Sequence, residues 1–111
     1  RMSALPPSPA HPVSTPLAIP SPFTNATLAA VLTDRGAGSA VVVLAPGFRA
    51  TREHPILRAV AEALPVSAVR FDFSGNGEST GRFCYGNYRE EAEDVRAVVE
   101  FVRGELGREV L

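Results

Sequence analysis

Three short stretches of the chain have the residue pattern of strands. Positions 40–45 are apolar without alternation, and a turn at Pro46-Gly47 ends them. A strand of this kind is buried on both faces, as in a parallel sheet covered by helices. Positions 68–73 predict a second strand, and positions 27–32, rich in β-formers and alanine, predict a shorter one.

A helix is predicted between the two longer strands. Pro55 suits the first helical position, and Pro65 ends the segment. Apolar residues recur between them at helical spacing and form one stripe: Leu57, Val60, Ala61 and Leu64.

A second helix is predicted from Asn87 to Gly107. Asn87 has the character of an N-cap, and Glu90 follows three residues later as in a capping box. Acidic residues in the first turns and arginines near the end match the helix dipole. The predicted apolar face consists of Ala92, Val95, Val99, Val102 and Leu106.

The order of these elements predicts an α/β fold. Strand, helix, strand and helix follow one another, and positions 108–111 open what looks like a further strand. Such an order is typical of βαβ units with right-handed crossovers and a parallel sheet.

The first 24 residues differ in composition from the rest. Seven of the ten prolines lie before position 23, and this segment has no acidic residue. Proline fixes φ and removes a donor, which excludes a helix or a central strand. We therefore expect residues 1–24 to be a Pro-rich, extended, solvated leader and residues 25–111 to form the domain. This leader could be a plain linker or the tail of an organelle transit peptide, and both interpretations are open. Without such targeting, we expect the protein to be cytoplasmic.

Composition narrows the classes of function. A net charge of −1 gives no electrostatic reason to expect nucleic acid as a partner, and no run approaches the length of a membrane span. One cysteine cannot form an internal disulfide. The chain has no lysine, which excludes a P-loop and a Schiff base. With His11 and His54 as the two histidines, we expect no metal site and no organic cofactor.

The loop after position 73 contains two motifs that could carry chemistry. Residues 77–81 match Gly-x-Ser-x-Gly, but an elbow needs its serine directly between strand and helix, and five residues separate Phe73 from Ser79. Gly75-Asn76-Gly77 resembles a dinucleotide-binding turn, but the helix begins too late to direct its amides at a pyrophosphate. A glycine-dense loop with φ > 0 at Gly75 and Gly77 is the favoured interpretation.

Other single residues offer weaker candidates. Cys84 has the character of inert packing. His54 is interpreted as a helix cap or a surface residue, and Asp72 as a cap of the following loop, with the orienting of a base as the alternative. The turn at positions 44–48 lies at the carboxyl end of a buried strand, where ligands bind in α/β sheets. The Phe48 N–H is therefore our candidate oxyanion-hole donor, with a plain turn as the alternative.

Taken together, three stretches resemble the amino-terminal part of an α/β-hydrolase, of the serine aminopeptidase and acylglycerol lipase-like type. They are positions 41–48, 53–64 and 69–79, the last reading Val-Arg-Phe-Asp-Phe-Ser-Gly-Asn-Gly-Glu-Ser. In that family the first strand ends in His-Gly-Phe, whose last amide contributes to the oxyanion hole. Here Pro46 replaces the histidine, whereas Gly47 and Phe48 match, and Ser74 stands where the family has arginine.

The resemblance implies hydrolysis of an ester, amide or thioester through an acyl-enzyme, with an acyl compound or peptide as substrate. The family's nucleophile elbow follows the strand that would begin at Val110, and its acid and histidine come later. We therefore expect this chain to be a truncated hydrolase-like protein, inactive alone. The alternative is a non-catalytic interaction module, or half of a complex in which a partner chain completes the sheet.

Overall fold

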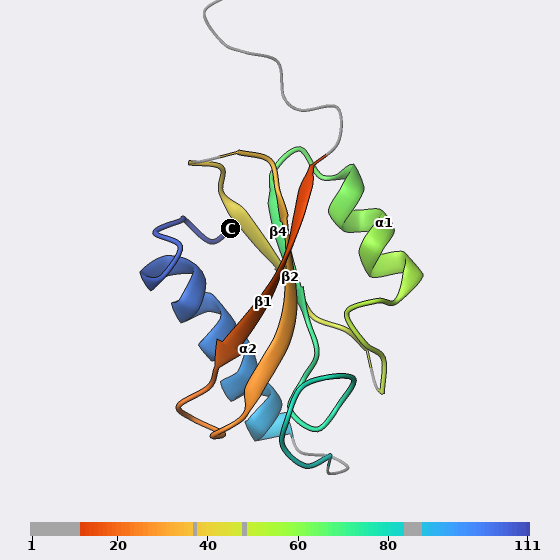
Figure 1. The fold of residues 1–111 in the computed structure, drawn as a ribbon, viewed down its shortest axis with the longest axis vertical. Coiled ribbons are helices and arrows are strands. Elements are labelled where there is room, and N and C mark those ends of the chain that lie inside the picture. The colour runs from red at the N-terminus through yellow and green to blue at the C-terminus, as the bar shows by residue number, and fades with distance from the viewer. Residues whose placement is uncertain (1–11, 37, 48, 84–87) are drawn as a thin grey trace, which may run out of the picture.

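The computed structural model describes residues 12–36, 38–47, 49–83 and 88–111. Within these ranges the chain forms four strands and two helices (Figure 1). In chain order they are β1 (Val13–Pro20), β2 (Thr27–Asp34), β3 (Val41–Leu44), α1 (Pro55–Ala63), β4 (Ser67–Phe71) and α2 (Tyr88–Gly104).

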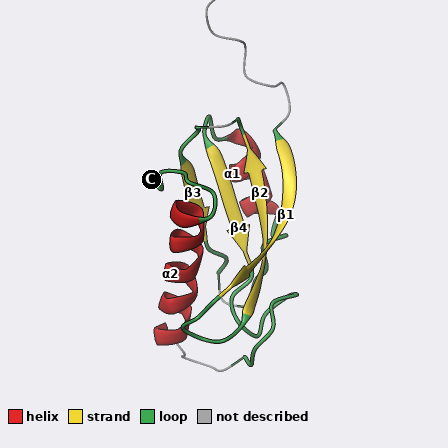
Figure 2. Ribbon diagram, turned by 60° about the vertical axis from the view of Figure 1, so that its left-hand side comes forward, coloured by secondary structure: helices red, strands yellow, loops and turns green. Residues whose placement is uncertain are grey.

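The strands form one mixed sheet in the order β1-β2-β4-β3. β3 and β4 are parallel and are joined through α1, as the apolar pattern predicted. β2 pairs antiparallel with both β1 and β4, which the pattern did not predict. The two helices lie on opposite faces of the sheet (Figure 2), so the fold is α/β.

The structure corrects the prediction for part of the first 24 residues. Val13–Pro20 is not a solvated leader but strand β1, which pairs with β2 along its whole length. Ile19 is completely buried in the core. An edge strand tolerates Pro16 and Pro20 because it needs ladder donors on one side only. Residues 1–11 lie outside the described residues.

The main core lies between the sheet and α2. Its fully buried side chains come from all four strands and α2, and include Ile19, Leu28, Val41, Val69, Phe71, Val98 and Val102. The Phe71 and Phe73 rings meet edge to face with centroids 4.9 Å apart. Full burial of such a side chain contributes about 1.5–3 kcal/mol.

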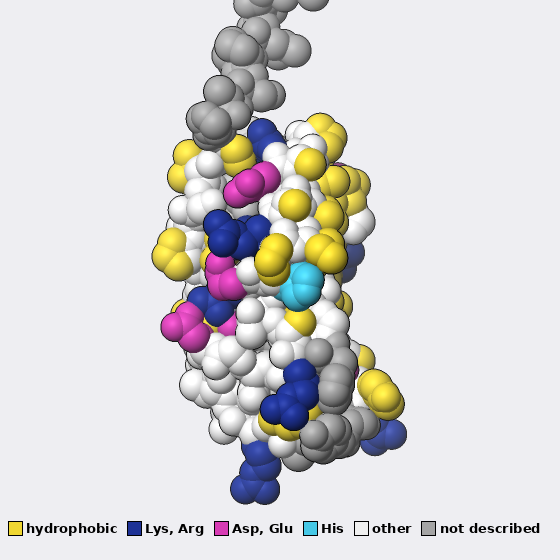
Figure 3. Space-filling model, turned by 90° about the vertical axis from the view of Figure 1, so that its right-hand side faces the viewer, with side chains coloured by type: hydrophobic (Ala, Val, Ile, Leu, Met, Phe, Trp, Pro, Cys, Tyr) yellow, Lys and Arg dark blue, Asp and Glu magenta, His cyan; other side chains and the backbone are white. Residues whose placement is uncertain are grey.

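Helix α1 begins at Pro55 as predicted. The His54 ring accepts a hydrogen bond from the Ile56 N–H at 3.2 Å, which confirms the cap interpretation of this histidine. The predicted stripe is only partly covered, because Ala61 is buried and Val60 is 38% exposed. Apolar side chains gather on the outer surface of α1 (Figure 3), where Ile56 is 66% exposed.

Helix α2 buries the predicted face in part, since Val102 is completely buried and Val95 and Leu106 pack against the core. Its buried residues are Asp94, Ala97, Val98 and Val102, whereas Ala92 is exposed. The buried face also includes Asp94, whose carboxylate accepts hydrogen bonds from Ser74. Asn87, the predicted N-cap, lies outside the described residues.

The last residues, where a further strand was predicted, pair in parallel with β3 through one isolated bridge. Val110 forms a bridge with Val41 of β3. The Val41 N–H donates to the Glu109 carbonyl at 2.8 Å, and the Leu111 N–H donates to the Val41 carbonyl at 2.9 Å.

Candidate active-site edge

The carboxyl ends of β3 and β4 meet at one edge of the sheet, because the two strands are parallel. Loop 45–54 follows β3 and loop 72–83 follows β4 (Figure 1). In an open α/β sheet, ligands bind at this edge. The candidate site therefore consists of these two loops, which we call the β3 loop and the β4 loop.

The β3 loop turns immediately after the strand. Pro46 is buried and Gly47 is exposed, and the Ala50 N–H donates to the Gly47 carbonyl at 3.0 Å. A side chain at Gly47 would meet no atom within 4 Å. Phe48 lies outside the described residues, so its role as an oxyanion-hole donor stays a prediction.

Asp72, directly after β4, joins the two loops. Its side chain is completely buried. One carboxylate oxygen, Oδ1, accepts the Arg52 backbone N–H at 2.6 Å. The other, Oδ2, accepts the Glu78 N–H at 2.9 Å and also the Arg52 guanidinium. Asp72 is thus a cap of the loop that follows it, which confirms the favoured interpretation of this residue.

Arg52 lies between two carboxylates. Its guanidinium contacts buried Asp72 and exposed Glu78. Burial alone would lower the pKa of Arg52, but the hydrogen bonds and charges of Glu78 and Asp72 outweigh this effect and raise it. Arg52 therefore stays charged and holds the β3 loop against the β4 loop.

Ser79 is a structural residue of the β4 loop. Its hydroxyl donates to the Asp72 carbonyl at 2.6 Å and accepts the Ala29 N–H at 2.9 Å. The next residue, Thr80, exchanges two hydrogen bonds with Thr27 of β2. No helix starts at Ser79, since positions 79 and 80 lie in a loop. These contacts agree with rejecting Gly-x-Ser-x-Gly as a nucleophile elbow here.

The two glycines before Ser79 allow close approaches of backbone. Gly75 and Gly77 have φ of +78° and +52°, as predicted. A Cβ at Gly77 would lie 2.2 Å from Oδ2 of Asp72, and one at Gly75 would lie 2.2 Å from the Phe83 nitrogen. The motif thus serves to close the loop over Asp72.

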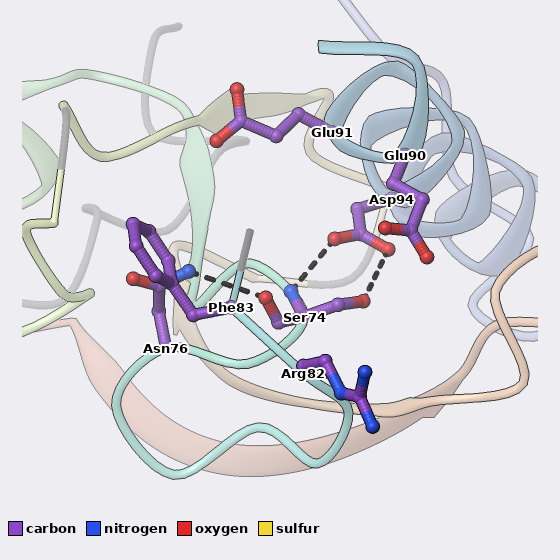
Figure 4. Close-up of a pocket in the computed structure, with 7 residues that line it drawn as sticks. All are labelled: Ser74, Asn76, Arg82, Phe83, Glu90, Glu91 and Asp94. Atoms are coloured by element: carbon purple, nitrogen blue, oxygen red, sulfur yellow. Dashed lines mark hydrogen bonds between the residues drawn. The ribbon is translucent and has the colours of Figure 1, made fainter. Parts of the chain in front are cut away.

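Asp94 of α2 holds the start of the β4 loop. It accepts the Ser74 N–H at 2.7 Å and the Ser74 hydroxyl at 2.8 Å (Figure 4). It also accepts the Thr24 hydroxyl at 3.2 Å. A cavity of about 10 Å³, room for one water, lies beside them. No role of Asp94 in the β4 loop was predicted from the sequence. Its spacing was a signal, because residues three and four positions apart share a helix face, and this spacing places Asp94 on the face of buried Ala97 and Val98.

The remaining candidates contribute no described chemistry. Cys84 lies outside the described residues. The Arg49 guanidinium lies 5.2 Å from the Phe83 ring centroid, a second contact between the two loops.

Within the described ranges no group of three or more His, Cys, Asp or Glu side chains could hold a metal ion. No described helix is long and apolar enough to cross a membrane.

Comparison with solved structures gives the class of fold. No protein-family model matches the sequence, and no curated protein matches it significantly. The esterase Pf2001 of Pyrococcus furiosus superposes with a TM-score of 0.70 at 24% identity, over 83% of this chain and 37% of that one. XC6422 of Xanthomonas campestris, described as an α/β serine hydrolase without lid, superposes with a TM-score of 0.67 at 24% identity, over 96% and 51%.

The chain therefore has the fold of the amino-terminal part of an α/β serine hydrolase. It spans between about a third and a half of the length of the solved structures that it matches.

Proposed function

We propose that this chain is the amino-terminal part of a serine-type hydrolase acting on an ester, amide or thioester. The observation that carries the proposal is the β3 loop, which leaves a strand of an α/β-hydrolase fold at the ligand-binding edge of the sheet. In this proposal the Phe48 N–H stabilises the oxyanion of the tetrahedral intermediate.

The attacking hydroxyl belongs to a serine outside these residues. Ser79 is the hydroxyl of the Gly-x-Ser-x-Gly string, and it already donates to the Asp72 carbonyl and accepts the Ala29 N–H. In this proposal residues 1–111 supply a scaffold and, through Phe48, one oxyanion-hole donor, and they have no activity alone. One cysteine and no internal disulfide accord with a cytoplasmic location.

A pair of substitutions at position 48 tests this function. Phe48→Pro removes the backbone N–H, whereas Phe48→Leu keeps it. In the natural protein, isolated with any polypeptide that completes its sheet, Phe48→Pro should lower kcat for p-nitrophenyl acetate by about 10²–10³. Phe48→Leu should change kcat little. A folded Phe48→Pro protein with unchanged kcat would refute the proposed oxyanion donor.

A second candidate function is favoured by the outer edge of β3. Among the described residues, β3 is paired on that side only through Val41, and Leu111 is 68% exposed. Such an edge can accept a strand of another chain. Sedimentation of the 111-residue chain tests this candidate, because a monodisperse monomer would argue against obligate pairing.

A further inference from the structure

We propose that Asp72 is the positioning residue of the β3 loop, the loop that carries the oxyanion donor. This inference rests on the proposed function for its catalytic meaning, while its structural part can be tested independently. Arg52, the residue that Asp72 holds, lies four positions after Phe48 in the same loop.

The first support is that each carboxylate oxygen of Asp72 accepts a backbone amide from a different loop. Oδ1 accepts the Arg52 N–H of the β3 loop, and Oδ2 accepts the Glu78 N–H of the β4 loop. A buried carboxylate is costly unless it is fully hydrogen-bonded, and here its bonds join two segments separated by a helix and a strand. Asp72 therefore determines where one loop lies relative to the other.

The second support is that Asp72 is itself held on three sides. Its N–H donates to the Ala29 carbonyl of β2 at 2.9 Å, and its carbonyl accepts the Ser79 hydroxyl. The Arg52 guanidinium neutralises its charge, with Glu78 on the other side of the guanidinium. Asp72 is thus fixed to the sheet through its backbone, and its carboxylate fixes the β3 loop relative to the sheet.

The third support is the glycine above the carboxylate. Gly77 lets the β4 loop approach so closely that a Cβ there would overlap Oδ2 of Asp72. A substitution at Gly77 would displace the carboxylate without touching the β3 loop directly. It therefore gives a way to disturb Asp72 from the opposite loop.

Hydrogen exchange of the 111-residue chain tests the structural part. Gly77→Ala should speed exchange of the Arg52 amide by about tenfold or more, because this amide loses a hydrogen bond to a charged group. The matched control is Gly107→Ala, since Gly107 has a similar φ of +61° but no atom within 4 Å of its Cβ position. The control should leave Arg52 exchange unchanged.

Asp72→Asn is the second variant. Its amide retains one acceptor where the carboxylate offers two, so its nitrogen must face a donor from Arg52 or Glu78. We expect faster exchange at Arg52 or Glu78, with core amides such as that of Val69 unchanged. Equal acceleration of all amides in both variants, or unchanged exchange at Arg52 in Gly77→Ala, would overturn the inference.

A double-mutant cycle tests the catalytic part in the isolated natural protein. If Asp72 acts through the β3 loop, Asp72→Asn lowers kcat of the otherwise unchanged protein with little change in KM. In a protein that already carries Phe48→Pro, the same substitution lowers kcat no further. Equal losses in both backgrounds would overturn the positioning role and leave the proposed function standing. An unchanged kcat in Phe48→Pro alone would instead refute the proposed function, and the exchange data would still decide whether Asp72 holds the loop.

Discussion

Two buried aspartates hold the β4 loop, one at each side. Asp72 lies at the end of β4 and Asp94 lies on α2, and both are almost completely removed from solvent. Each accepts hydrogen bonds from backbone amides and from other side chains. Burial of a carboxylate is tolerated here because every bond to it is charge-assisted.

Loss of the Asp94 carboxylate should destabilise the protein. Asp94→Ala leaves the Ser74 and Thr24 donors without their acceptor, and we expect the free energy of unfolding to fall by about 3 kcal/mol. Urea denaturation measures this change. The control is Glu100→Ala on the same helix, whose exposed pair with Arg96 should contribute under about 0.5 kcal/mol. Equal losses in the two variants would contradict the assigned role of Asp94.

Asp34 gives a prediction for acid stability. Burial alone would raise the pKa of its carboxyl, but the hydrogen bond and charge of Arg108, with the Gly36 N–H and the Ser67 hydroxyl, lower it below 3.8. The unfolded chain therefore binds this proton more tightly. The resulting stabilisation is present above about pH 4 and is lost as pH falls through the lowered pKa.

Arg108→Gln should remove much of that acid-sensitive stabilisation. We expect the difference in Tm between wild type and variant to be largest near neutral pH and to shrink below about pH 4. Melting curves across this range measure it. Arg103→Gln removes the same charge from the exposed end of α2 and should lack this dependence. A constant difference at all pH values would contradict the pairing.

At the scale of single residues, roles that depend on nearby positions could be predicted from the sequence, and contacts between distant positions could not. The roles of Asp72, His54 and Ser79 were predictable because each depends on residues within a few positions or on the distance to the next helix. The bonds from Asp72 to Arg52 and from Asp94 to Ser74 join positions 20 residues apart. No local pattern encodes such a pairing, since it depends on how the sheet brings the two loops together.

At the scale of elements, the edge strand β1 was the least predictable part of the sheet. Proline density indicated an extended segment, which is correct for the backbone of Val13–Pro20 but not for its environment. Proline excludes a central strand and permits an edge strand. The pairing with β2 and the burial of Ile19 distinguish the edge strand from a solvated leader. The parallel pair β3 and β4 was predictable because its strands are short, apolar and separated by a helix.

A substitution in β1 tests whether this strand is part of the folded domain. Ile19→Ala should lower the free energy of unfolding by about 2–4 kcal/mol, since Ile19 is completely buried in the core. Val13→Ala in the same strand should change it by under about 0.5 kcal/mol, because Val13 is 63% exposed. Chemical denaturation measures both. A neutral Ile19→Ala would mean that β1 adds little to the domain.

At the scale of the whole molecule, the apolar pattern predicted the α/β class and the comparisons with solved hydrolases agree with it. The antiparallel pairing of β2 with β4 was not predictable, because β3 and α1 separate these strands in the chain and no local pattern determines which strand β2 joins or in which direction. Solved structures of this fold extend well beyond the part matched here. We propose that these residues form the scaffold beside a nucleophilic serine outside residues 1–111.

Labelling with a fluorophosphonate tests that claim most directly. The natural protein, isolated with any polypeptide that completes its sheet, would be treated with the probe, digested and mapped by mass spectrometry. We predict a single adduct on a serine outside residues 1–111 and none on Ser79, whose hydroxyl is held by Asp72 and Ala29. An adduct on Ser79, or the absence of any adduct, would contradict the account.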